Sequence, residues 1–134
     1  MKRALFLLTM LTALSWSVTN AQVSKTFACN FENATDTAAW TFINGSAINQ
    51  WHIDTATNNG SGSHAMYISN DNGATNTYTN SQATSFVIAY HEVYIMGGTT
   101  TTLSFDWKAW GESNYDYLRV ALIPVDFNFT PNTL

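Results

Sequence analysis

One short segment of the sequence gathers aromatic and polar side chains suited to binding a ligand. A flat aromatic ring offers a face on which a sugar can stack, and Trp and Tyr also dominate protein-binding surfaces. Polar neighbours then orient the ligand through hydrogen bonds. The alternative is that the rings cover the second face of a sheet. The candidate binding residues are Trp110, Glu112, Asn114, Tyr115, Tyr117 and Arg119.

These side chains lie at the centre of a predicted β-hairpin. Residues 103–110 alternate apolar and polar positions, as do residues 115–123, and this is the period of half-buried strands. Gly111 and Asn114 supply the turn between them. We expect the rest of the chain to cover the apolar face of this hairpin. That face carries Leu103, Phe105, Trp107, Ala109, Leu118, Val120 and Leu122.

The remaining sequence predicts one domain of the all-β class. The chain has 134 residues, of which only 10% are charged, and its abundant Thr, Tyr, Phe and Trp favour strands. Beyond the N-terminus no stretch has helical periodicity. Turn residues separate the apolar runs at Asn44-Gly45 and Asn70–Gly73. Further strands are expected over residues 23–31, 40–43, 49–54, 65–69 and 85–95.

The first residues are typical of a secretory signal peptide. Lys2 and Arg3 precede an apolar run over residues 4–18, and the small residues of 19–21 favour cleavage after Ala21. The run is too short for a comfortable membrane span, and no second apolar segment follows it. The net charge of -4 offers no basic patch for nucleic acid. We therefore expect a secreted or cell-surface protein whose mature chain is 22–134.

Several motifs, taken in order, are similar to those of one domain family. The chain resembles the MAM-like jelly-roll domains, and more narrowly the cleaved-adhesin ("choice-of-anchor") domains of secreted bacterial surface proteins. The resemblance implies an antiparallel two-sheet jelly-roll sandwich, which binds proteins or glycans or acts as a spacer, and which sits beside further domains. The motifs are Cys29–Glu32, Trp40, Asn49–Trp51, Ala65–Gly73, Leu103–Trp107 and Asp116–Val120.

Two departures from the family pattern affect what we expect. Cys29 is the only cysteine of the chain, so the partner that MAM domains give their first cysteine is missing. The second half of a full jelly roll is missing too. We therefore expect residues 22–134 to be a sandwich truncated at its C-terminus. The hairpin of 103–123 would then lack a neighbouring strand and expose an apolar face.

The resemblance also implies a structural calcium ion. Some jelly rolls of this type hold one, and calcium requires six to eight oxygen ligands. Glu32 after the first strand and Asp106 in the Phe-Asp-Trp motif are the matching positions, and Asn44 could add an oxygen. The alternative is that these are ordinary surface residues. No other cofactor is expected.

The sequence gives little support to catalysis. The three histidines lack the spacing of a metal pair, and no nucleophile motif is present. Asp106, Glu112 and Asp116 could supply a glycosidase pair only if a cleft brought two of them together. We therefore predict a non-catalytic adhesion module that recognises an extracellular glycan or protein. The alternatives are a structural spacer of a larger secreted peptidase or glycosidase, and a hydrolase.

Overall fold

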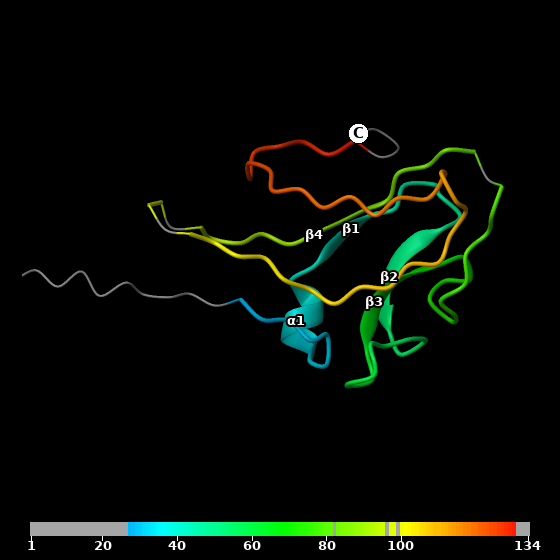
Figure 1. Cartoon of the computed structure of the whole chain (residues 1–134), viewed down its shortest axis with the longest axis horizontal. Helices are drawn as coiled ribbons and strands as arrows, with labels where there is room; N and C mark the ends of the chain where they lie inside the picture. Colours follow the sequence, from blue (N-terminus) through cyan, green and yellow to red (C-terminus); the bar gives the residue numbers. More distant parts are fainter. Residues whose placement is uncertain (1–26, 82, 96, 99, 131–134) are drawn as a thin grey trace, which may run out of the picture.

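The computed structural model describes residues 27–81, 83–95, 97–98 and 100–130, and builds them around two small antiparallel sheets. Strand β1 (Thr41–Ile43) pairs with β4 (Ile88–Tyr90), and β2 (Gln50–Asp54) pairs with β3 (Ala65–Ser69). One short helix, α1 (Ala34–Ala38), precedes β1. Figure 1 shows α1 beside one end of the two sheets. The regular structure is mostly strand, which agrees with the predicted all-β class.

The β2–β3 hairpin is the largest paired unit. Its register runs from Gln50 opposite Ser69 to Asp54 opposite Ala65. Side chains on neighbouring strands share a face when they are directly opposite, so His52 and Tyr67 lie together. Tyr67 and Ser69 are buried, and this face is therefore the better-covered one. Both strands were expected from the sequence within a residue of these bounds.

The turn after β3 folds back onto this buried face. The Tyr67 hydroxyl donates to the Gly73 carbonyl at 2.6 Å, and the Gly73 N–H donates to Ser69 Oγ at 2.9 Å. Gly73 has a φ of +88°, and a Cβ there would lie 3.1 Å from His52 Nδ1. The positive φ favours glycine, and a Cβ would force the His52 ring to shift slightly. Asn72 also has a positive φ of 62°, so the predicted Asn-Gly turn is confirmed, although no strand follows it.

Trp51 of β2 joins the two sheets. Its backbone N–H donates to Asn44 Oδ1 at 2.8 Å, and its carbonyl accepts from Asn44 Nδ2 at 3.2 Å. Asn44 directly follows β1, so its amide pairs with β2 as a strand's backbone would. The indole Nε1 of Trp51 also donates to the Val87 carbonyl, just before β4, at 3.1 Å. One residue thus ties β2 to both strands of the other sheet at a single end, because Asn44 follows Ile43, Val87 precedes Ile88, and these two strand residues pair with each other.

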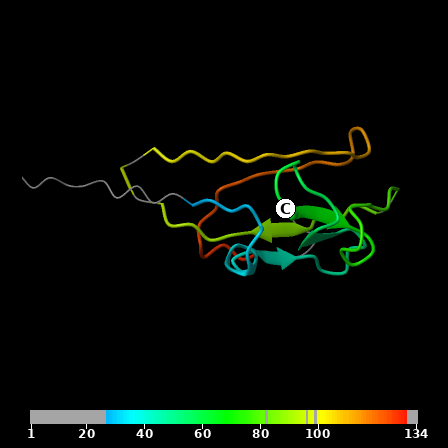
Figure 2. The ribbon, with the colours of Figure 1, turned by 90° about the horizontal axis from the view of Figure 1, so that it is seen from below.

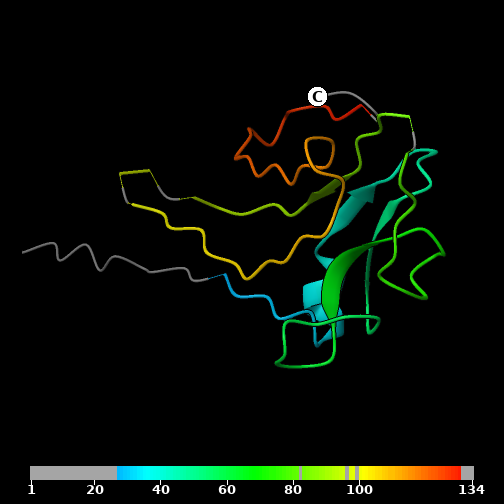
Figure 3. The same ribbon diagram turned by 45° about the vertical axis from the view of Figure 1, so that its right-hand side comes forward.

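Aromatic rings pack around β1 and β4. His91 lies 4.3 Å from the ring of Phe27 and 5.5 Å from that of Trp40, centroid to centroid. On β4 itself, Tyr90 stacks on Phe129 with centroids 4.9 Å apart. The segment near Phe129 therefore returns to the sheet, as the red trace of Figure 3 shows.

The helix α1 lies in a part of the chain where the sequence showed no helical periodicity. Asn33 is its N-cap: the Asn33 Oδ1 accepts from the Asp36 N–H at 2.9 Å, and Asn33 Nδ2 donates to the Asp36 carboxylate at 2.9 Å. This reciprocal arrangement satisfies free donors at a helix start. Five residues are too few to show helical periodicity, so only the cap could have revealed it.

The predicted hairpin of 103–123 is wrong as a paired unit. Residues 103–110 and 115–123 contain no strand, and the apolar side chains of both segments are exposed. Figure 2 shows them running along one side of the molecule, apart from the two sheets. Strand propensity alone does not make a strand, because each one needs a neighbour to take its backbone hydrogen bonds.

Other expected strands are shorter or lie elsewhere. The strand expected over 85–95 is confirmed only at β4, and the segments around Gly97–Gly98 project away from both sheets (Figure 1). Residues 27–31 form no strand. The expected signal peptide 1–21, and the start of that first strand, lie outside the described residues.

Asn49 provides a test of how the loops are held. Its side-chain amide donates to the Thr79 carbonyl at 2.9 Å and accepts from the Thr79 N–H at 2.7 Å. We predict that Asn49→Ala lowers the free energy of unfolding by about 1–3 kcal/mol, because two half-buried backbone groups lose their partner. Asn76→Ala is the control, since Asn76 is exposed. Urea unfolding of both variants measures the difference, and equal losses would contradict the prediction.

Candidate functional site

A tight turn presents Trp110. The Glu112 carbonyl accepts from the N–H groups of Tyr115 at 3.0 Å and Asp116 at 3.1 Å, and the Glu112 N–H donates to Asp116 Oδ2 at 2.6 Å. Gly111 is required for space, because a Cβ there would lie 2.7 Å from the same carboxylate oxygen. Asn114 takes the left-handed conformation, with φ 69°. The turn chemistry predicted for Gly111 and Asn114 is therefore confirmed.

This turn docks on the polar segment 76–81. The Ser81 N–H donates to Glu112 Oε2 at 3.0 Å. The pKa of the Tyr78 hydroxyl is raised, first by desolvation and then by the neighbouring Asp116 and Glu112 carboxylates. Tyr78 therefore lies beside the turn, and its protonated hydroxyl hydrogen-bonds to the Asp116 carboxylate.

A pocket of about 410 Å³ opens between the two segments. The Trp110 side chain is 94% exposed, so its indole face is free for a ligand. The other lining groups are amides, a hydroxyl and a phenol, all of which form hydrogen bonds with sugars. The pocket thus combines an aromatic platform with polar groups that orient a ligand. It is lined by Asn76, Thr77, Tyr78, Asn80 and Trp110.

The other predicted binding residues lie outside this pocket lining. Tyr115 and Tyr117 are exposed, and the Tyr117 hydroxyl donates to the Asn114 carbonyl at 2.8 Å. The Arg119 guanidinium lies 5.9 Å from the Tyr117 ring centre. Sequence reasoning found Trp110 and missed the residues from the 76–80 segment. The one available signal was Tyr78, an isolated aromatic in a long polar run.

Glu32, a predicted calcium ligand, holds a loop in the structure. Its Oε1 accepts from the backbone N–H of Ser63 at 2.6 Å and of His64 at 2.8 Å. Its Oε2 lies 3.1 Å from His64 Nδ1. These hydrogen bonds stabilise the charged carboxylate, the one from the His64 N–H most of all, and lower the pKa of Glu32.

Asp106 binds the same loop from its other end. Asp106 Oδ2 accepts from Asn59 Nδ2 at 3.1 Å. Two residues on, Lys108 Nζ donates to Thr57 Oγ1 at 2.7 Å and to the Asn58 carbonyl at 3.0 Å. The face of this segment expected to point outward is therefore the one that contacts the protein.

The three predicted calcium ligands do not form a closed group. Asn44 is occupied by Trp51, whereas the two carboxylates lie against opposite ends of the loop 57–64. Among the residues that the structure describes, no three His, Cys, Asp or Glu side chains gather closely enough to hold a metal ion.

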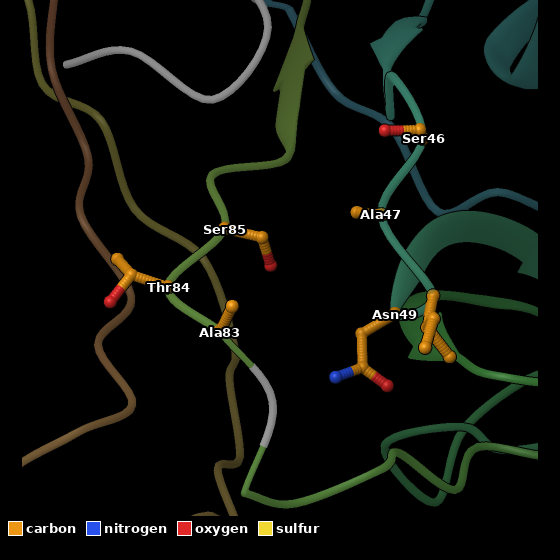
Figure 4. A pocket seen from close by; sticks show the side chains of 7 residues that line it. Ser46, Ala47, Asn49, Ala83, Thr84 and Ser85 are labelled. Carbon is orange, nitrogen blue, oxygen red and sulfur yellow. The ribbon is translucent and has the colours of Figure 1, made fainter.

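A second pocket, of about 310 Å³, lies between residues 46–49 and 83–85 (Figure 4). Its walls are mostly small side chains, and the Asn49 amide is already bonded to Thr79. Thr84 turns away from the space. Without an aromatic platform, this pocket is less suited to a sugar than the one at Trp110.

Comparisons with known proteins assign no family. No protein-family model, curated protein or solved structure matches the chain. Within the described residues, no helix has the length and apolar character needed to cross a membrane.

The Glu32 contacts predict a dependence of stability on pH. The pKa of Glu32 in the folded state lies below the ordinary 4.5. The Glu32 contacts therefore stabilise the fold fully above pH 4.5, and this stabilisation is lost as the pH falls through the lowered pKa. Glu32→Gln should therefore be less stable than the parent at neutral pH, and the difference should narrow in acid. Denaturant midpoints at several pH values measure it.

Glu92→Gln is the matched control, because Glu92 is exposed and none of the described hydrogen bonds involves it. Its effect should be small at every pH. If the difference in denaturant midpoint between the parent and Glu32→Gln stays constant from neutral to acid pH, the charged Glu32 carboxylate does not stabilise the loop as proposed.

Proposed function

We propose that this protein is an exported, non-catalytic adhesion module that binds an extracellular glycan at the Trp110 pocket. The observation that carries the proposal is the indole of Trp110, almost fully exposed beside a pocket lined with hydrogen-bonding groups. A sugar ring has an apolar C–H face and a hydroxyl edge. Stacking on the indole would use the C–H face, and the exposed amide of Asn76 would bond to the hydroxyl edge.

The charges around the pocket favour a neutral glycan over an acidic one. Glu112 and Asp116 are the ionisable groups that act on Tyr78, and both are carboxylates. An anionic sugar would be repelled by them, since like charges in close proximity oppose binding. A protein ligand remains the alternative and would use the exposed Tyr115 and Tyr117 as well.

The proposed module binds and does not hydrolyse its ligand. Both carboxylates beside the pocket already accept backbone hydrogen bonds, Glu112 from Ser81 and Asp116 from Glu112. A glycosidase needs one free carboxylic acid and one free carboxylate facing each other across the bond to be cleaved. Their engagement supports a binding role.

The finer fold and the location form part of the same proposal. The two sheets are compatible with a jelly-roll sandwich of the MAM-like, cleaved-adhesin type, in which residues 22–134 form one module of a larger surface protein. Residues 1–21 would direct its export, and it would act outside the cell beside further domains. Such a position would place the Trp110 pocket where extracellular glycans are available.

Replacement of the indole tests the binding site. We predict that Trp110→Ala weakens binding by about 2 kcal/mol, roughly thirtyfold in Kd, because the stacking surface is lost. Calorimetric titration with cello-, xylo-, manno- and chito-oligosaccharides measures it. Tyr115→Ala is the matched control, since this ring is also exposed on the turn but lies outside the pocket lining.

An equal loss in both variants would favour a broad protein-binding surface. No binding of the parent to any of these sugars would contradict the glycan proposal and favour a structural spacer.

We also propose that the module binds a structural calcium ion at the loop 57–64. Glu32 and Asp106 both contact this loop, whose carbonyl groups would complete the oxygen ligands. Thermal unfolding with and without calcium tests this. A folded state that binds the ion gains about 2.7 kcal/mol at a hundredfold excess over Kd, and Glu32→Ala should abolish the gain. A midpoint indifferent to calcium would rule the site out.

A further inference from the structure

The segment 101–110 is extended and unpaired along its edge. Of the backbone hydrogen bonds among the described residues, none involves this segment. Figure 2 shows it, in yellow to orange, running along one side of the molecule apart from both sheets. Its N–H and C=O groups are free to pair with a strand from another chain, in the way that exposed sheet edges recruit partners.

Its side chains divide into two rows. Leu103, Phe105 and Trp107 are 69%, 51% and 65% exposed, a row of large apolar groups facing solvent. The opposite row carries Asp106 and Lys108, which contact the loop 57–59 through neutral groups only. Neither charge has an oppositely charged partner among the described residues.

We propose that this segment pairs with the same segment of a second copy of the chain, forming a two-fold antiparallel strand pair centred on Trp107. In such a pair, residues opposite each other are equidistant from the centre and share a face. Asp106 of each copy therefore lies opposite Lys108 of the other, twice. The two apolar rows join into one surface, with Phe105 opposite Ala109.

The charge pattern selects a second copy at this segment. The neighbouring extended segment 115–123 carries Asp116 and Arg119, which have opposite parity. A two-fold antiparallel pair puts only residues of equal parity opposite each other, so these two charges cannot compensate across a symmetric dimer. Residues 103–110 are thus self-complementary in charge, and residues 115–123 are not. Neither charge lines the Trp110 pocket, so charge exchange leaves the pocket lining unchanged, although Trp110 itself lies opposite Ser104 of the second copy in this register.

Charge exchange tests the register. Sedimentation velocity of the parent over a range of concentrations should show a reversible monomer–dimer equilibrium. Asp106→Lys and Lys108→Asp should each weaken the dimer roughly tenfold in Kd, because two attractive cross-strand pairs become repulsive. The double exchange, Asp106→Lys with Lys108→Asp, should restore it. An equimolar mixture of the two single variants should form heterodimers more strongly than either forms homodimers.

A covalent readout keeps the proposal testable if a charge variant folds poorly. In a Cys29→Ser background, Trp107→Cys should form a disulfide-linked dimer under mild oxidation, because opposite Cα atoms of a strand pair lie within disulfide range. Leu122→Cys is the control and should cross-link far less. A monomer at all concentrations, a dimer indifferent to the charge exchange, or equal cross-linking at both positions would each overturn the proposal.

Discussion

The structure depends on the pairing of β2 with β3. Five residue pairs form this hairpin, and the side chains that hold the other segments start from it or next to it. Trp51 bonds to residues next to β1 and β4 at one end of their sheet, Tyr67 and Ser69 fix the turn at Gly73, and Asn49 holds Thr79. The segment clamped by Asn49 contains the polar wall of the Trp110 pocket. The polar wall is thus connected to the hairpin through Asn49 and also through Asn70, which directly follows β3 and bonds to Thr77 and Thr79.

The small number of paired strands explains why side chains hold the loops and why residues 101–123 are exposed. Each sheet has two strands, and a two-stranded sheet covers little apolar surface. Side-chain amides and carboxylates therefore supply hydrogen bonds that further strands would otherwise make, as Asn44 does for Trp51 and Glu32 for the loop at Ser63. The same shortage leaves residues 101–123 extended and exposed. The lack of pairing strands thus accounts both for the hydrogen bonds of Asn44 and Glu32 and for the exposed apolar side chains of residues 101–123.

The sequence predicted local structure better than tertiary pairing. β2 and β3 were found because alternation and turn residues lie within a few positions of each other. Residues 103–123 have a stronger alternation, yet they form no strands, because alternation reports a preference and not the presence of a neighbour. The helix α1 was missed although Asn33 and Asp36 have the spacing of an N-cap pair, a signal overlooked in a polar segment.

The sequence predicted only part of the candidate site, because the site joins segments that lie far apart in the chain. Trp110 was recognised because its parity is opposite to that of Trp107, which predicts an indole that faces solvent. Tyr78 and its neighbours come from a segment about thirty residues earlier, and contacts such as Ser81 with Glu112 and Tyr78 with Asp116 bring the two segments together. Parity suggested that Asp106 points outward, whereas it binds the loop at Asn59. Such long-range contacts between side chain and loop have no signature in local sequence.

Hydrogen–deuterium exchange at a dilution that keeps the protein monomeric tests the central claim most directly. If the β2–β3 hairpin is the hub, amides of residues 50–54 and 65–69 should exchange most slowly, while those of 101–110 and 117–123 should exchange at nearly the rate of an unfolded chain. Strong protection of 101–110 in the monomer, equal to that of β2, would contradict the account and show that this segment is a paired strand.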